Sequence, residues 1–284
     1  MSIVLKNVSY TYGKCGSDCK QALKGINLEI HKGEFLAIVG HTGSGKSTLI
    51  QLLNGLERAT EGEVYFGGEN INAKGFSMKS LRSKVGLVFQ YPEHQLFEAT
   101  VIKDVEFGPR NMGQEPLQAE LNSFQALKDV GIGEELLDVS VLALSGGQKR
   151  RVAIAGVLAM QPEFLVLDEP MAGLDPAGRK EIFALLKKLH RERGITIVFV
   201  SHSMEDVAEY ADRVVVMNQG QIVLDGRPRR VFHYEKELQQ IGLGVPQATQ
   251  LAHCLMERGA DITQDCLTAE ECATAVLKWL GTRQ

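Results

Sequence analysis

Short stretches rich in β-forming residues occupy the first third of the chain, and several of them alternate between apolar and polar side chains. Such alternation is typical of strands that bury one face against a core. Lys32 and Gly33 separate two of these stretches and predict a tight turn between them. We expect strands at residues 3–12, 26–30, 35–39, 63–66 and 85–89.

Later stretches are either strongly apolar or apolar at the spacing of a helix. Residues 164–167 are all apolar, which is typical of a strand buried on both faces, and residues 195–200 predict a second buried strand. Residues 214–217 and 221–224 flank an Asn-Gln-Gly turn and predict a hairpin. We expect helices at residues 48–56, 145–160 and 180–193.

The order of these elements indicates the fold class. Strands and helices alternate along the chain, which predicts an α/β protein. From residue 92 to about residue 141 the pattern becomes helical, with acidic and polar faces. We therefore expect a helical subdomain over about residues 91–160.

The pattern changes again after Arg227. Helices are expected at residues 245–258 and 268–279, and Thr268 with Glu271 forms a candidate capping box for the second. We expect two domains: residues 1–229 and a small added domain of residues 230–284.

Composition narrows the possible functions. A formal net charge of −4 over 284 residues gives no electrostatic basis for binding nucleic acid, and we expect none as a partner. No apolar run approaches the ~18 residues of a membrane span. The first residues lack a basic segment followed by an apolar one, so we expect no secretion signal and a cytosolic chain.

Five cysteines without a secretion signal suggest thiols and not a disulfide framework. Cys15 and Cys19 are close enough to suggest a metal site. No second pair has zinc-ribbon spacing, however, so we interpret them as loop residues.

A glycine-rich loop follows the strand at residues 35–39. Its glycines let successive backbone N–H groups point at one anion, and the next helix directs the positive end of its dipole to the same place. Lys46 would contact the β- and γ-phosphates of ATP, and the Ser47 hydroxyl would bind Mg²⁺. We expect ATP to be bound by Gly40, His41, Thr42, Gly43, Ser44, Gly45, Lys46, Ser47 and Thr48.

Polar residues follow three other predicted strands. In an open α/β sheet the carboxyl ends of the strands face the ligand crevice, so these residues are expected to meet there. Asp168 would hold Mg²⁺ through water, and Glu169 would polarise the attacking water. His202 would reach the γ-phosphate, and Gln90 would meet Mg²⁺ or water. Without the glycine-rich loop, a structural loop histidine would be the simpler interpretation of His202.

The sequence LSGGQ at residues 144–148 forms a second glycine-rich anion site. Ser145 is predicted to cap a helix, and Gly146 and Gly147 leave its first N–H groups bare. The following Lys149, Arg150 and Arg151 are expected to keep the area electropositive. One nucleotide rarely needs two such sites in one chain, so two chains facing each other are expected.

Together these motifs resemble the ABC-type ATPases, the nucleotide-binding subunits of ABC transporters, over about residues 1–230. The resemblance implies a P-loop NTPase fold with a RecA-like core, an antiparallel β part and a helical subdomain. It also implies that ATP lies between the P-loop of one subunit and the LSGGQ segment of the other, here Ser145, Gly146, Gly147 and Gln148.

Three further positions of that pattern are informative. By resemblance, Tyr12 would stack on adenine and Asp175 would contact the partner across the dimer. Met171 stands where the family usually has a small residue, commonly Thr or Ser, so local packing is expected to differ while the chemistry stays the same.

Other strings resemble the ATPases of energy-coupling factor (ECF) transporters, which import vitamins and transition metals. These strings are His41-Thr42, YPEHQLF at residues 91–97 and FGPRN at residues 107–111. The resemblance, closest to the second ATPase of the pair, implies a short helix at residues 93–97 beside a docking groove. It also implies a C-terminal domain that helps hold the ATPase pair together.

The same resemblance implies the partners. They are a second ATPase subunit, a transmembrane scaffold and a substrate-binding membrane subunit, so the chain would lie on the cytoplasmic side of the cell membrane through them alone. Leu96 and Phe97 would then be either core residues or apolar surface that awaits a partner helix.

Three other functions are possible. A soluble ABC ATPase of DNA repair or translation typically has long coiled-coil insertions or two cassettes, and neither occurs here. A nucleotide-gated interaction protein would not need both Glu169 and His202. A small-molecule P-loop kinase would leave LSGGQ unexplained.

Overall fold

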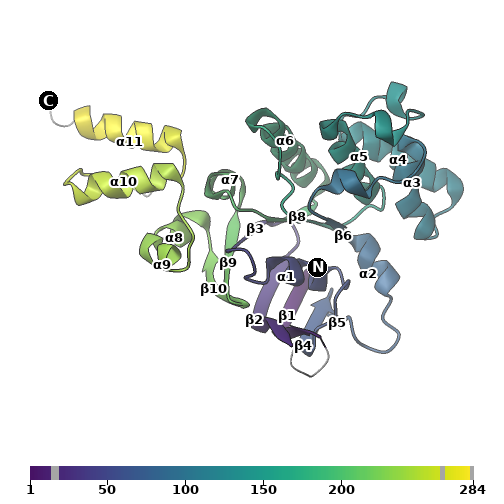
Figure 1. The fold of residues 1–284 in the computed structure, drawn as a ribbon, viewed down its shortest axis with the longest axis horizontal. Coiled ribbons are helices and arrows are strands. Elements are labelled where there is room, and N and C mark those ends of the chain that lie inside the picture. The colour runs from purple at the N-terminus through teal and green to yellow at the C-terminus, as the bar shows by residue number, and fades with distance from the viewer. Residues whose placement is uncertain (14–18, 263–265, 282–284) are drawn as a thin grey trace.

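The computed structural model describes residues 1–13, 19–262 and 266–281, so Cys15 and the interpretation placed on it lie outside the described part of the chain. Two β-sheets form the centre of the molecule. Helices α3 (Val101–Asn111), α4 (Pro116–Asp129) and α5 (Gly146–Leu158) gather at one end of its long axis (Figure 1). Helices α10 (Gln247–Glu257) and α11 (Ala269–Gly281) lie at the other end.

The first sheet is antiparallel and has the strand order β2-β1-β4-β5. It contains the expected first strand, while β2 begins six residues earlier than predicted because its first residues pair with the end of β1, Tyr12 opposite Lys20. The short strand β5 was not predicted. The bounds are β1 (Ser2–Tyr12), β2 (Lys20–His31), β4 (Glu61–Phe66) and β5 (Glu69–Asn70).

The second sheet has the order β10-β9-β3-β8-β7-β6 and is parallel except for β10, which pairs antiparallel with β9 as the predicted hairpin. The strands of this sheet end within one residue of their predicted limits, apart from the two hairpin strands, which are slightly longer. The bounds are β3 (Phe35–Val39), β6 (Val85–Val88), β7 (Phe164–Leu167), β8 (Thr196–Val200), β9 (Arg213–Asn218) and β10 (Gln221–Gly226).

The parallel sheet is buried on both faces, as its apolar strands predict. Along β3, Leu36 and Ile38 pack with the antiparallel sheet and helix α1 (Lys46–Leu53), whereas Ala37 and Val39 pack with α5 and α6 (Pro176–Arg193). Successive side chains of a strand point to opposite faces, so one short run serves two cores. Because the strands are buried, their carboxyl ends have fixed positions, and the candidate site residues follow these ends.

Helix limits differ from the predictions at a few places. Helix α6 begins four residues early because Asp175 caps it, accepting the N–H of Gly178 at 2.7 Å, and Pro176 occupies the first turn. Thr268 caps α11, but the Glu271 carboxylate accepts the N–H of Leu267 at 2.8 Å, so the predicted reciprocal bond to Thr268 is wrong. Four short α-helices were not predicted: α2 (Met78–Lys84), α7 (Met204–Tyr210), α8 (Pro228–Phe232) and α9 (Glu235–Gln240).

The described residues that follow β10 pack in two different ways. Val231, Phe232 and Leu238 of α8 and α9 join the main core. Helices α10 and α11 instead form a small cluster of their own around Ala252 and Cys272. Within the described residues, no helix has both the length and the hydropathy that crossing a bilayer requires.

Candidate active site

The predicted site residues lie at one edge of the parallel sheet. Strands β3, β8, β7 and β6 are neighbours in that order, and each ends in a segment with a candidate residue. The P-loop follows β3, His202 follows β8, Asp168 and Glu169 follow β7, and Gln90 follows β6. The carboxyl ends of parallel strands meet at one edge, so the strand order itself brings these side chains together.

The P-loop is built so that side chains cannot replace its glycines. A Cβ at Gly40 would lie 2.5 Å from both the carbonyl oxygen of Met217 and Ser44 Oγ. Gly45 has a φ of 103°, and a Cβ there would lie 2.6 Å from the carbonyl oxygen of Ala22. The loop therefore needs glycine for both conformation and space. The Ser44 N–H donates to the carbonyl oxygen of His41 at 3.1 Å, so the N–H groups that could face an anion are those of the other loop residues.

Lys46 is buried beneath this loop. Its Nζ donates to the carbonyl oxygens of Gly40 at 2.8 Å and His41 at 3.0 Å. Burial lowers the pKa of Lys46, and the nearby carboxylates of Glu169 and Asp168 partly offset that effect. The ammonium group is thus desolvated and held by backbone carbonyl oxygens of the P-loop.

The pKa of Asp168 is shifted in the opposite direction to that of Lys46. Burial raises its pKa, a hydrogen bond from the Ser47 side chain acts in the opposite direction, and the charge of Glu169 raises it again. A buried carboxylate beside a hydroxyl, with a second carboxylate near, is a donor set that suits a hard divalent cation. Ser44 Oγ is buried and makes no hydrogen bond among the described residues. The residues present therefore fit a nucleotide phosphate with Mg²⁺.

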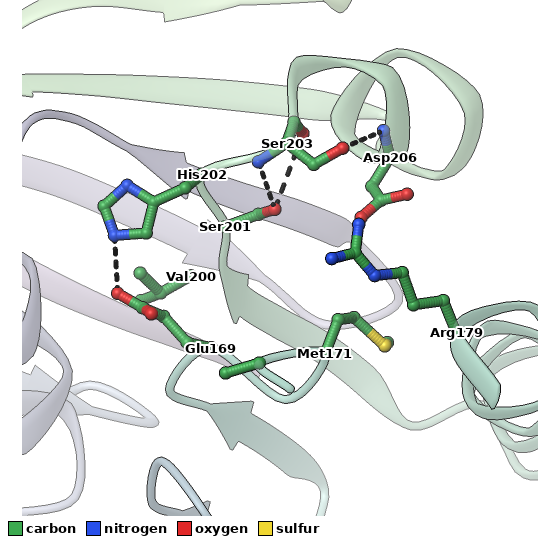
Figure 2. A pocket seen from close by; sticks show the side chains of 9 residues that line it. Glu169, Met171, Arg179, Val200, Ser201, His202, Ser203 and Asp206 are labelled. Atoms are coloured by element: carbon green, nitrogen blue, oxygen red, sulfur yellow. Dashed lines mark hydrogen bonds and ion pairs between the residues drawn. The ribbon is translucent and has the colours of Figure 1, made fainter. Parts of the chain in front are cut away.

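Glu169 is held by two other predicted residues. Its Oε1 lies 2.6 Å from His202 Nε2, and its Oε2 accepts a hydrogen bond from Gln90 Nε2 at 3.0 Å. Figure 2 shows His202 and Glu169 pointing toward each other across the ends of β8 and β7. A carboxylate fixed on both oxygens has a defined direction, as a general base requires.

The backbone around His202 is fixed by the serines on either side of it. Ser201 Oγ accepts the N–H of Ser203 at 3.0 Å, and Ser203 Oγ accepts the N–H of Asp206 at 3.2 Å (Figure 2). The second bond caps helix α7 (Met204–Tyr210). These two hydrogen bonds fix the turn that carries His202, and the imidazole is thereby held next to Glu169.

Replacing His202 with alanine is expected to slow ATP hydrolysis about 10- to 100-fold while ATP affinity changes little, because the imidazole orients Glu169 and the P-loop is untouched. The side chain is 45% exposed, so the unfolding midpoint should change little. Phosphate release and binding of a fluorescent ATP analogue measure the two effects. His31→Ala, an exposed histidine of β2, is the matched control, and equal losses in both variants would contradict the assignment.

The LSGGQ segment begins helix α5 as predicted. Ser145 Oγ accepts the N–H of Gln148 at 3.3 Å, and Gln148 Oε1 accepts the N–H of Ser145 at 2.9 Å, which completes a capping box. No atom lies within 4 Å of a Cβ built on Gly146 or Gly147. Among the described residues, no hydrogen bond joins this segment to the P-loop. Within the described part of the chain, the segment thus makes no hydrogen bond to the chain's own nucleotide site.

The remaining predicted residues lie in or near the P-loop, apart from Asp175 at the start of α6. Tyr12 is 40% exposed, and its hydroxyl bonds to Thr48 Oγ1 at 2.9 Å. His41 Nε2 lies 3.0 Å from Asn218 Oδ1, and Asp175 uses one oxygen to cap α6. Thr42 and Gly43 are exposed at the loop tip.

One expectation for the segment after LSGGQ is wrong. Arg150 does not add to an exposed electropositive surface, because it is only 3% exposed and its guanidinium turns inward to Glu93 and to two backbone carbonyls. The signal that could have revealed it is helical spacing: Arg150 shares one buried face of α5 with Ile154 and Leu158, at i+4 and i+8. Sequence reasoning missed Glu93 as its partner.

The sequence matches the family model described as ABC transporter over residues 23–172. The chain belongs to the ABC transporter family. It is similar to the energy-coupling factor transporter ATP-binding protein EcfA2 of Caldanaerobacter subterraneus subsp. tengcongensis, with 51% identity over 284 residues, which cover 100% of this chain and 99% of the relative. The protein of that description from Clostridium perfringens is 51% identical and covers 98% of each chain. The resemblance predicted from the sequence is confirmed.

Solved structures agree with this placement. That of cbiO1 from Clostridium perfringens, described as part of the ABC transporter complex cbiONQ, has a TM-score of 0.74 and 42% identity, covering 90% of this chain and 98% of that one. The dimeric ATP-binding cassette MJ0796, in a post-hydrolysis state with ADP and Pi, has a TM-score of 0.70 and 34% identity, covering 80% and 99%. The predicted fold class is confirmed, and the chain is an ABC-type ATPase.

Proposed function

We propose that the chain is the ATP-hydrolysing motor subunit of an ECF-type importer for vitamins or transition-metal ions, coupled to uptake through a transmembrane scaffold. The observation that carries the proposal is that the chain contains two separate groups of candidate nucleotide-binding residues. The P-loop and Glu169 form one group. Among the described residues, no hydrogen bond joins this group to the LSGGQ segment, and a Cβ built on Gly146 or Gly147 would meet open space. Two ATPase subunits, identical or different, would complete each other's sites.

The chain's own residues account for the steps of hydrolysis. Lys46 and the P-loop amides would bind the β- and γ-phosphates, and Ser47, Asp168 and Gln90 would hold Mg²⁺. When bound, Mg²⁺ would supply positive charge against the phosphoryl oxygens. Glu169 accepts the proton of the attacking water.

Closure and adenine binding involve residues outside that centre. The partner subunit's LSGGQ segment would cover the γ-phosphate at the start of its helix. In this chain the corresponding residues are Ser145, Gly146, Gly147 and Gln148. Tyr12 would stack on adenine, and Asp175 would contact the partner with its free oxygen. Hydrolysis breaks the bond between the β- and γ-phosphates, and release of the phosphate then removes the anion that the partner's segment covers, so the pair reopens.

The docking segment, which we define as residues 91–97, is the proposed contact with the scaffold. It contains the short helix η1 (Pro92–Gln95) and ends at Phe97, whose side chain is 63% exposed. Phe97 meets the half-exposed ring of Phe107 edge-on, with ring centroids 4.8 Å apart. A groove beside these rings is lined by Glu98, Glu106 and Arg110. An exposed aromatic pair at a polar groove suits an apolar partner helix.

Replacing Phe97 with serine is expected to leave ATP binding and the unfolding midpoint unchanged, because the ring is exposed. The yield of transmembrane scaffold that co-purifies with the tagged chain from native membranes should fall about tenfold, as for loss of an aromatic anchor of an interface. Quantitative mass spectrometry of the purified complex measures the yield.

Leu56→Ser is the matched control, because Leu56 is 48% exposed but lies after α1, outside the groove. Equal recovery from the wild type, Leu56→Ser and Phe97→Ser would contradict docking through Phe97. Recovery of a self-paired protein without membrane subunits in all three would instead favour an ABC ATPase that takes no part in transport.

We also propose the division of the chain into residues 1–229, with a helical subdomain of about residues 91–160, and residues 230–284. The separate cluster of α10 and α11 supports an added module at the C-terminus. Its exposed leucines, Leu251, Leu277 and Leu280, suit a role in holding the ATPase pair together.

A further inference from the structure

The Arg150 guanidinium is a buried junction between three segments. It extends from the first turns of α5 and uses four of its N–H groups. Nε donates to Glu93 Oε2 at 3.1 Å, and Nη2 donates to Glu93 Oε1 at 2.9 Å. Nη1 donates to the carbonyl oxygen of Pro170 at 3.0 Å, and Nη2 to that of Ala172 at 3.0 Å.

Each partner belongs to a functional part of the molecule. Glu93 lies in η1, within the docking segment and three residues after Gln90. Pro170 and Ala172 belong to the loop that begins at Glu169 and leads to Asp175. Arg150 itself follows the LSGGQ segment on α5. One side chain therefore joins the docking segment, the loop after Glu169 and helix α5. We call α5 the signature helix because the LSGGQ segment begins it.

The docking segment and the loop also lie close together. A Cβ built on Gly173 would be 3.7 Å from Tyr91 Cε1, so the ring lies next to the loop backbone. Tyr91 and Glu169 both have positive φ, 55° and 47°, which is strained for residues with side chains. Each segment thus contains a residue whose backbone is held in an unusual conformation.

The ion pair has the geometry of a strong one. Arg150 and Glu93 form a bidentate fork whose side chains are 4% and 18% exposed. Burial, the largest single effect, would raise the pKa of Glu93. The hydrogen bonds and the charge of Arg150, with a backbone hydrogen bond and nearby His94, together outweigh burial and hold the pKa below its ordinary value. Both groups are therefore charged at neutral pH, and neither moves without leaving the other unpaired.

We propose, resting on the proposed function, that Arg150 is a positioning residue that transmits displacement of the docking segment to the loop after Glu169 and to the signature helix. A partner helix that moves η1 moves Glu93, and the rigid guanidinium carries the movement to Pro170 and Ala172. Docking and the geometry of the catalytic carboxylate are then coupled by one side chain.

Two variants test this coupling. Glu93→Gln keeps the shape of the acceptor and removes its charge, and Arg150→Lys keeps the charge and removes the fork. The matched control is Arg193→Gln, which breaks an ion pair between α6 and Asp129 of α4 and touches neither the docking segment nor the loop. All three are compared with the wild-type chain, alone and in the complex purified from native membranes.

The first measurement is hydrogen–deuterium exchange of the isolated chain. The loop amides of Ala172 and Leu174 donate to Glu169 and Met171, which should protect them. We expect exchange to rise at least fivefold in both residues 91–95 and 170–174 in each of the two variants, and in neither segment in the control. A rise confined to the segment that carries the lost contact, or no rise, would overturn the proposal.

The second measurement is turnover by the complex at saturating ATP and Mg²⁺. We expect kcat to fall about tenfold in Glu93→Gln and Arg150→Lys, while KM for ATP and binding of a fluorescent ATP analogue by the isolated chain stay within twofold of wild type. Unchanged kcat, or a loss of nucleotide binding together with kcat, would show a packing role only and overturn the coupling. A wild-type complex that contains no membrane subunits or hydrolyses no ATP would refute the proposed function instead.

Discussion

The Glu169→Gln variant is expected to release phosphate about 10²–10³ times more slowly than the wild-type chain, because an amide cannot accept a proton from water. The fold should be preserved, since the amide has the same shape and its oxygen can still accept the hydrogen bond from Gln90. ATP binding should be equal or tighter, because one negative charge facing the triphosphate is removed. The closed two-subunit state should therefore accumulate with ATP and Mg²⁺.

Two measurements check this expectation, namely phosphate release and the ATP-dependent shift to a larger species in size-exclusion chromatography. Glu163→Gln is the matched control. Glu163 lies just before β7, at the opposite end of the strand from Glu169, and pairs with Lys84 at 3.0 Å and Lys32 at 3.2 Å. Turnover should be normal in the control. Near-normal hydrolysis by Glu169→Gln would contradict the role of general base.

Much of the site could be predicted because its motifs are local and its strands are fully apolar. Phe35–Val39 and Phe164–Leu167 were predicted to the residue, since an apolar run flanked by glycine or acidic residues leaves little freedom in where a buried strand ends. Once those ends are placed, the parallel order brings Lys46, Asp168 and Glu169 to one edge. For these three residues, the local sequence pattern and the general topology of parallel sheets were sufficient to predict that they lie together.

The Arg150 junction could not be predicted because no local pattern connects its parts. Glu93 lies 57 residues before Arg150, and the other two partners are backbone carbonyls, which have no signature in the sequence. A run of three basic residues does not show which one turns inward. Similarly, Glu271 bonds to Leu267 and pairs with Arg229, so a tertiary contact helps set how the α11 cap closes.

Lys46→Met is expected to weaken strongly the stabilisation of the chain by ATP while leaving the nucleotide-free chain about as stable as wild type, or more so. Burial lowers the pKa of Lys46, so the folded chain holds the proton less firmly than the unfolded chain. At every pH below the ordinary pKa of lysine the buried charge therefore costs stability, and removing it relieves that cost. The loss of the two bonds to Gly40 and His41 offsets part of this gain.

The effect on binding should be large, because a charge-assisted contact contributes about 1.5–3 kcal/mol, or about 10- to 100-fold in affinity. For the wild-type chain, ATP at about 100 times its Kd should stabilise by about 2.7 kcal/mol and raise the unfolding midpoint by about 5–10 °C. Thermal unfolding with and without ATP and Mg²⁺ measures both quantities.

Lys32→Met is the control, because Lys32 lies on the surface and pairs only with Glu163 among the described residues. It should keep the full ATP-dependent shift. A Lys46→Met chain that unfolds at a much lower temperature without nucleotide would show that the ammonium group holds the P-loop together. A chain that keeps the full ATP-dependent shift would show that the backbone amides alone bind the phosphates, and the placement of Lys46 beneath Gly40 and His41 would then have no part in nucleotide binding.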